Sequence, residues 1–184
     1  MALLESKAFV SGCPCPDFDL PTVEGGRVRR ADLDGSSALL VLFLCNHCPY
    51  VQAIEDRLIA LAREFDDRGM RFVGICSNDA AAYPDDSPAK LQQRWLAKDY
   101  RFPYLIDASQ EVARRFDAVC TPEFYLFGAE RRLAYHGRLD DHWKEAGQVK
   151  RRDLALAIEA VLSGVAPAEP QHPSLGCSIK WKAR

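Results

Sequence analysis

The sequence predicts an α/β sandwich built around a mixed β-sheet. Short apolar runs alternate along the chain with amphipathic stretches whose apolar residues recur at helical spacing, which is the pattern of strands connected by helices. Two later strand-like runs are separated by only a short turn and are followed by one more helical stretch. This order adds a hairpin to the strand–helix alternation, so the predicted sheet is mixed.

The first part of the chain contains the strand and the helix on which this prediction depends most. Residues 1–37 are rich in Gly, Pro and Asp, with short strand-like pieces such as 27–33. Residues 39–44 form a continuous apolar run, which suits a central strand buried on both faces. The helix predicted next stops at Arg68 and Gly69. Its apolar positions are Val51, Ile54, Leu58, Leu61, Ala62 and Phe65.

The alternation of strands and helices then continues. Residues 71–76 have the composition of a second buried strand, and 78–88 form a loop with many turn residues. Residues 89–98 predict a helix, and 104–106 predict a short strand.

The remaining elements complete the sandwich. Ser109 is the expected N-cap of a helix that continues through Phe116. Residues 124–127 and 132–136 predict the two strands of a hairpin. Residues 153–162 predict a last helix.

Length and charge limit the possible function classes. A chain of 184 residues can form one domain with a full core, so we expect a single domain over 1–184 with a C-terminal extension at about 165–184. The net charge is −2 with both signs interspersed, which argues against a nucleic-acid partner. No apolar run approaches the roughly 20 residues that cross a bilayer, which argues against a membrane partner. The sequence does not indicate an oligomeric state.

The chain has seven cysteines, an odd number that argues against a fully paired extracellular framework. In a reducing compartment, cysteines serve more often in catalysis, in metal binding or in the core than in structural disulfides. The residues before Cys13 include charged Glu5 and Lys7 and lack the apolar length of a signal peptide. We therefore expect a cytoplasmic protein.

The segment LLVLFLCNHCPYV, residues 39–51, carries the strongest functional signal. An apolar strand ends at Cys45 and Cys48, and a proline then opens an amphipathic helix. The free N–H groups and the positive end of the dipole at a helix N-terminus favour a thiolate. The segment therefore predicts thiol chemistry.

The position of Pro49 indicates which cysteine opens the helix. If Cys45 were the N-cap, Pro49 would occupy N4, whose N–H group should donate the first intrahelical hydrogen bond, and proline has none. If Cys48 is the N-cap, Pro49 falls at N1, where proline is favoured. We therefore expect Cys48 to be the leading thiol and Cys45 to lie on the strand side. Cys45 is then either the resolving thiol, at a spacing that permits a disulfide, or a small apolar residue ending the strand.

Four stretches resemble the redoxin branch of the thioredoxin fold, which includes the peroxiredoxin-like AhpC/TSA proteins. They are GCPCPDFDLP at 12–21, VRRADLDG at 28–35, the segment 39–51, and VCTPEFYLF at 119–127. The pieces CNHCPYV, CTPEFYLF and GCSIKWK also resemble a bacterial group of thioredoxin-like proteins. The resemblance implies a thioredoxin-like three-layer sandwich with a central mixed sheet and an N-terminal redoxin extension.

The resemblance also implies site residues. Cys48 matches the leading cysteine of the family, and Thr121 and Pro122 match its cis-proline dipeptide, which lies against that sulfur and presents backbone for substrate pairing. Cys120 would then lie near the site, either as a second partner for Cys48 or as a core residue.

The other polar and sulfur-bearing positions leave alternatives open. His47 either assists Cys48, as a proton carrier or by lowering its pKa, or is a solvated loop histidine. Cys13 and Cys15 form an accessory pair with Cys177 or have no role, and Cys76 is expected in the core. The pair Cys45 and Cys48 has the spacing of half a zinc site, but we expect neither a metal nor another cofactor.

The sequence departs from both parent templates. Relative to peroxiredoxins, Cys45 replaces the threonine, Val41 replaces the proline, and CTPE stands in the region of the arginine. Relative to thioredoxin, Leu42 replaces the buried aspartate and Val51 the second cysteine.

Three functions follow from this comparison. The leading hypothesis is a thiol–disulfide oxidoreductase that takes protein or small-molecule disulfides as substrates and is restored by a thiol reductant. The alternatives are a thiol peroxidase, in which Cys48 becomes a sulfenic acid, and a redox-sensing or binding module without turnover.

Overall fold

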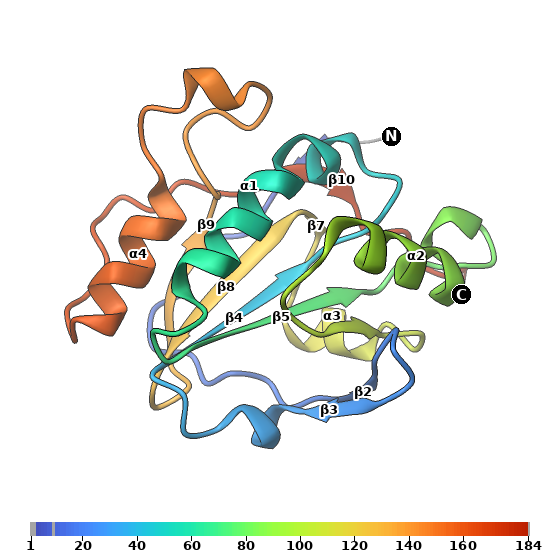
Figure 1. Ribbon diagram of the computed structural model, residues 1–184, viewed down its shortest axis with the longest axis horizontal. Coiled ribbons are helices and arrows are strands. Elements are labelled where there is room, and N and C mark those ends of the chain that lie inside the picture. The colour runs from blue at the N-terminus through green and yellow to red at the C-terminus, as the bar shows by residue number, and fades with distance from the viewer. Residues whose placement is uncertain (1–2, 9, 184) are drawn as a thin grey trace.

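A mixed five-stranded sheet forms the centre of the protein (Figure 1). We describe it from a computed structural model, which covers residues 3–8 and 10–183. The strand order is β6-β5-β4-β8-β9, in which β4, β5 and β6 are parallel and β8 and β9 are antiparallel to their neighbours. The strands are β4 (Ala38–Phe43), β5 (Met70–Cys76), β6 (Tyr104–Ile106), β8 (Glu123–Gly128) and β9 (Leu133–Gly137). The predicted mixed α/β sheet is confirmed.

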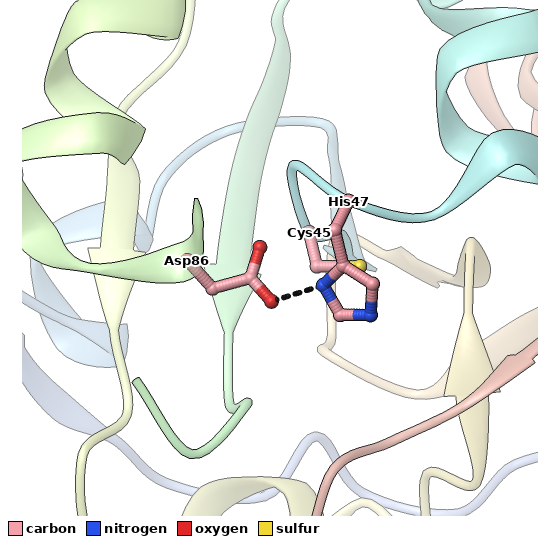
Figure 2. Close-up of side chains that lie close together, drawn as sticks. All are labelled: Cys45, His47 and Asp86. Atoms are coloured by element: carbon pink, nitrogen blue, oxygen red, sulfur yellow. Dashed lines mark hydrogen bonds and ion pairs between the residues drawn. The ribbon is translucent and has the colours of Figure 1, made fainter. Parts of the chain in front are cut away.

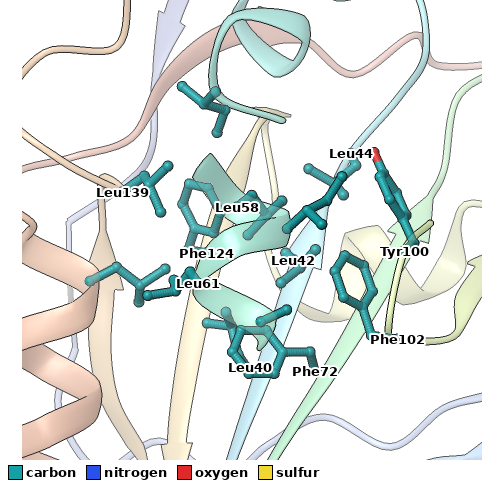
Figure 3. Packing of buried hydrophobic residues seen from close by; sticks show 14 of the residues in the cluster. Leu40, Leu42, Leu44, Leu58, Leu61, Phe72, Tyr100, Phe102, Phe124 and Leu139 are labelled. Atoms are coloured by element: carbon teal, nitrogen blue, oxygen red, sulfur yellow. The ribbon is translucent and has the colours of Figure 1, made fainter. Parts of the chain in front are cut away.

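The two faces of the sheet bury two separate hydrophobic clusters. Because successive side chains of a strand point to opposite faces, β4 gives Leu40 and Leu42 to one cluster and Leu39 and Val41 to the other. All six residues of β4 are fully buried, as the uninterrupted apolar run predicted. Figure 3 shows the first cluster, which packs between the sheet and helix α1.

Helices and an N-terminal hairpin cover these faces and give the molecule three layers. Residues of α1, α2 and α4 pack in the first cluster, whereas α3 and β2 contribute to the second. The helices are α1 (Pro49–Phe65), α2 (Pro88–Lys98), α3 (Glu111–Arg115) and α4 (Asp153–Leu162). The hairpin consists of β2 (Asp19–Pro21) and β3 (Arg27–Arg29). Short 3-10 turns lie at η1 (Arg30–Leu33), η2 (Pro84–Asp86) and η3 (Ala146–Gln148).

The start of α3 corrects one prediction. The N-cap is Gln110, with φ of 64°, and not Ser109. The Gln110 side chain is buried and its amide donates to the carbonyl oxygens of Ser77 at 2.7 Å and Lys180 at 2.8 Å. These two long-range bonds hold Gln110 at the helix start, and Ser109 instead donates to the Asp107 carboxylate.

A second, three-stranded sheet lies across one end of the molecule and was not predicted. Its order is β1-β10-β7, with β1 at Leu3–Glu5, β7 at Cys120–Thr121 and β10 at Leu175–Ser178. Both pairings are antiparallel, and Cys177 lies opposite Leu3 on one side and Thr121 on the other. The C-terminal strand β10 thus pairs with the N-terminal strand β1 on one side and with β7, about 55 positions earlier in the sequence, on the other.

We refer to residues 174–182 as the C-terminal strap. Beyond β10, the Ile179 N–H donates to the Val119 carbonyl at 3.0 Å, and the Lys180 N–H donates to the Asn78 side chain at 2.8 Å. The Lys182 N–H donates to Gln110 at 2.9 Å. The strap is therefore fixed to three separate loops. Within the described residues, no helix is both long and apolar enough to cross a membrane.

Candidate active site

Cys48 is the N-cap of α1, as the position of Pro49 predicted. The backbone of Cys48 is extended, with φ of −80° and ψ of 120°, and Pro49 occupies the first helical position. The first intrahelical bond runs from the Gln52 N–H to the Cys48 carbonyl at 3.0 Å. Strand β4 therefore leads through Cys45 into a turn that presents Cys48 at the start of the helix.

The Thr121–Pro122 peptide is cis and lies against both sulfur atoms. The Cys48 sulfur lies 3.1 Å from the Thr121 carbonyl oxygen, and the Cys45 sulfur lies 3.2 Å from the Thr121 hydroxyl. Strand β7 holds Thr121 in this place. The predicted cis dipeptide is confirmed, and residues more than 70 positions apart in sequence meet at one point.

The environment favours a thiolate at Cys48. A hydrogen bond from the Cys45 thiol is the largest cause that lowers the pKa of Cys48 to about 5, and the Val51 N–H and the thiol and N–H of Cys177 add to it against the effect of burial. The same bond, burial and the Asp86 charge raise the pKa of Cys45 well above its usual range. The pair therefore carries one negative charge, on Cys48, which accepts hydrogen bonds from neutral donors.

We expect the substitution Cys45→Ala to raise the pKa of Cys48, because it removes the largest contribution that lowers it. The thiolate absorbance of the wild type should rise through about pH 5. In the variant the rise should move toward the ordinary cysteine value of about 8.5. The matched control is Cys13→Ser, since Cys13 is exposed. An unchanged Cys48 pKa in Cys45→Ala would contradict this account.

The C-terminal strap brings a third sulfur to the site. Cys177 lies opposite Thr121 in the β10–β7 pair and hydrogen-bonds to Cys48. Burial, the bond to Cys48 and the Cys48 charge raise the pKa of Cys177 to about 12. The neighbouring Gly176 permits this approach, because a Cβ atom there would lie only 2.1 Å from the Thr121 carbonyl oxygen.

The remaining cysteines differ in their surroundings. Cys120 and Cys76 are buried, and burial raises the pKa of both thiols, with the Glu123 charge adding to the effect at Cys120. Burial also raises the pKa of Cys15 to about 12. Cys15 packs in the cluster on the sheet face opposite to that of Cys177, so the arrangement does not favour an accessory pair between them.

A buried carboxylate, which the sequence analysis missed, positions His47. The His47 Nδ1 atom lies 2.6 Å from the Asp86 Oδ2 atom, and the two side chains are 14% and 0% exposed (Figure 2). Asp86 also accepts from the Asn46 N–H at 2.7 Å and from the Asn78 amide at 2.8 Å. His47 is therefore not a solvated loop histidine. Asp86 lies in a turn-rich loop 39 positions from His47, and no spacing in the sequence links the two.

Cys45, His47 and Asp86 together offer sulfur, nitrogen and oxygen atoms within 4.8 Å of one another. These donor types suit zinc, whose bond lengths of about 2.0–2.1 Å to nitrogen and oxygen separate two tetrahedral ligands by roughly 3.3 Å. The 2.6 Å contact between His47 and Asp86 is shorter than that separation, and both Asp86 oxygens already accept hydrogen bonds. The geometry is that of a hydrogen-bonded pair, and the residues fit an ion only after these bonds break.

The sulfur atoms of the site are shielded from solvent. Cys48 is 0% exposed, and Cys45 and Cys177 are each 2% exposed. A cavity of about 300 Å³ is lined by Pro122 of the cis peptide and Leu175 of the strap, among other residues, and by none of the three cysteines. Access to the Cys48 sulfur therefore requires movement of the groups that cover it.

Comparisons with known proteins show the family and the fold of the chain. The AhpC/TSA family model matches residues 11–136. An uncharacterized conserved protein from Geobacillus kaustophilus is 40% identical over 100% of this chain and 98% of its own, with a TM-score of 0.95. A hypothetical protein from Sinorhizobium meliloti 1021 is 41% identical over 98% and 99%, with a TM-score of 0.94.

A more distant solved structure shares the fold. A secreted disulfide oxidoreductase from Mycobacterium tuberculosis is 22% identical over 63% of this chain and 79% of its own, with a TM-score of 0.55. A search of curated proteins gave no match. The family model covers more than half of the chain, and the central sheet has a thioredoxin-like architecture. The chain therefore belongs to the AhpC/TSA family of thioredoxin-fold redoxins.

Proposed function

We propose that the protein is a thiol–disulfide oxidoreductase in which Cys48 is the nucleophile and Cys45 is the resolving thiol. Both sulfur atoms contact Thr121, at 3.1 and 3.2 Å, and this shared contact carries the proposal. The two-step exchange needs a thiolate that attacks the substrate disulfide and a neighbouring thiol that then attacks the mixed disulfide, and the pair supplies both groups.

The proposed reaction has two exchange steps. The Cys48 thiolate attacks one sulfur of a substrate disulfide, forms a mixed disulfide and releases the other sulfur as a thiolate that takes up a proton. Cys45 then loses its proton and attacks the Cys48 sulfur, which releases the second substrate thiol. The substrate gains two electrons, and the protein is left with a Cys45–Cys48 disulfide that a thiol reductant reopens.

Thr121 and Pro122 are the proposed substrate-binding residues. The Thr121 hydroxyl orients Cys45, and its backbone lies on the strand edge that now pairs with β10. An extended polypeptide substrate would take the place of β10 on this edge, whereas a small disulfide would need only a limited opening. We propose protein or small-molecule disulfides as substrates and the cytoplasm as the compartment, with no nucleic acid or membrane as partner.

The burial of Cys48 favours one second function, a thiol peroxidase. Cys48 is 0% exposed, and a peroxide would need a smaller opening to reach its sulfur than a polypeptide disulfide would. Cys48 would then become a sulfenic acid and condense with a neighbouring thiol to a disulfide, with release of water. Cys45 and Cys177 both hydrogen-bond to Cys48, and Cys120 lies close enough for its pKa to respond to the Cys48 charge.

Mild oxidation followed by peptide mapping tests the proposal. We expect a Cys45–Cys48 disulfide, together with turnover of insulin disulfides in the presence of dithiothreitol. A Cys48 disulfide to Cys177 or Cys120, with peroxide consumed and insulin untouched, would replace the proposal by the peroxidase. Reversible Cys45–Cys48 oxidation without turnover of either substrate would leave only a redox-sensing module.

A further inference from the structure

The His47–Asp86 pair has the geometry of a proton acceptor beside Cys45. The Asp86 carboxylate accepts at 2.6 Å, so His47 carries its ring proton on Nδ1 and presents a lone pair on Nε2. The Nε2 atom is buried and has no hydrogen-bond partner among the described residues. One ring nitrogen of His47 lies within 4.8 Å of the Cys45 sulfur, which is beyond direct hydrogen-bond distance, so proton transfer to Nε2 requires a small closure or an intervening water molecule.

Cys45 needs such an acceptor. Its pKa is raised by the bond to Cys48, by burial and by the Asp86 charge, so it remains protonated when the resolving step begins. Leu42 occupies the position at which the thioredoxin template has a buried carboxylate, so the base must come from elsewhere. Resting on the proposed function, we infer that His47 accepts the Cys45 proton during resolution and that Asp86 is the positioning residue that sets the histidine tautomer.

The proton and the electrons balance over this step. Cys45 transfers its proton to His47 Nε2, and the imidazolium that forms is stabilised by the Asp86 carboxylate. The Cys45 sulfur bonds to the Cys48 sulfur as the bond from Cys48 to the substrate breaks. The departing substrate thiolate takes the proton from His47, which returns to its neutral form.

The surroundings of His47 connect it to solvent and supply other charges. The His47 ring stacks on Tyr83 at 5.1 Å, and Lys180 lies 5.7 Å from the Tyr83 ring. His47 also lines a cleft of about 380 Å³, whose other charged lining residues are Asp85, Lys90, Arg94 and Lys98. Cys76 and Tyr104 lie behind Asp86, and burial raises the pKa of both, so neither competes as a base.

A reagent that releases a coloured thiol at each step separates attack from resolution. With 5,5′-dithiobis(2-nitrobenzoate) and all variants made in a Cys13→Ser background, because Cys13 is exposed, the first release follows attack by Cys48 and the second follows attack by Cys45. We expect His47→Gln to slow the second release by about a hundredfold or more and to leave the first release within about twofold. His142→Gln is the matched control, because His142 lies outside the site and should change neither phase.

The pH profile distinguishes a proton acceptor from a structural residue. In His47→Gln the second release should rise about tenfold per pH unit, because it then depends on the small ionised fraction of Cys45. Added imidazole should restore this phase in His47→Gly. Asp86→Asn, which keeps the shape of the side chain, should slow the second release less than His47→Gln does, with the first release retained.

Two results have different meanings. A second release in His47→Gln within twofold of the wild type at every pH would overturn the inference and leave the proposed function intact. Failure of the wild-type protein to give a second release, with the Cys48 mixed disulfide persisting, would overturn the proposed resolving role of Cys45 and the inference together. Far-ultraviolet circular dichroism of each variant establishes that it is folded, and Asp86→Asn provides the test if His47→Gln is not.

Discussion

The substitution Cys48→Ser is expected to reduce disulfide turnover to the uncatalysed rate. A serine hydroxyl at the start of α1 is not ionised near neutral pH, whereas the pKa of Cys48 is lowered to about 5. Loss of the proposed nucleophile would remove the covalent route altogether, and losses of this kind reach about a millionfold in well-studied enzymes. We expect at least about a thousandfold here, measured by insulin reduction with dithiothreitol.

Two other variants give this measurement its controls. Cys13→Ser should retain full activity, since Cys13 is exposed and lies outside the site. Cys45→Ser should still attack one substrate molecule and then accumulate the mixed disulfide at Cys48, which mass spectrometry detects. Full activity in Cys48→Ser would show that the leading thiol is another cysteine.

The substitution Gly176→Ala is expected to lower the free energy of unfolding by about 3 kcal/mol. The added Cβ would lie 2.1 Å from the Thr121 carbonyl oxygen, 2.5 Å from the Thr121 carbonyl carbon and 3.0 Å from the Pro122 nitrogen. All three are backbone atoms, which cannot rotate away as a side chain does, so β10 must leave the β7 edge. Thermal unfolding should show a fall in Tm of about 2–4 °C for each kcal/mol.

Gly147→Ala is the matched control, because a Cβ at Gly147 has no other atom within 4 Å. It should leave the Tm nearly unchanged, so the difference between the two variants isolates the contact of the strap with Thr121. Faster reaction of Cys48 with a bulky thiol reagent should accompany the loss of stability in Gly176→Ala. Equal Tm values for the two variants would contradict the close approach of β10 to β7.

Local patterns predicted the elements that bury large apolar faces. The run in β4 predicted a strand with both faces covered, and the apolar spacing in α1 and α4 predicted helices at nearly the observed bounds. The position of Pro49 predicted the N-cap at Cys48, because proline restricts the backbone within one turn. In each case the determining interaction lies within a few residues of the signal.

The parts that were not predicted depend on distant contacts. Strands β1, β7 and β10 have two to four residues each, too few for an alternating pattern, and β1 pairs with β10 across more than 160 positions. Gln110 starts α3 because its amide is bonded to Ser77 and Lys180, and a cap rule that considers only neighbours favours Ser109 instead. Asp86 lies in a polar segment rich in turn residues, so its sequence context predicts an exposed side chain. The fold instead buries this side chain against His47.

The sheet β1-β10-β7 also affects the rate at which the Cys48 thiolate reacts. Pairings between distant segments form late in folding, because loop closure must precede them, and a small sheet of short strands is among the first units to open by local unfolding. The observed rate at a shielded thiolate is then its intrinsic rate multiplied by the fraction of molecules in the open form, and about 1.4 kcal/mol of opening free energy lowers it tenfold. Cys48 can thus remain charged in the cell and yet be spared from chance oxidants. Substitutions that weaken the hydrogen bonds of residues 179–182 are expected to raise the open fraction and with it the reactivity of Cys48.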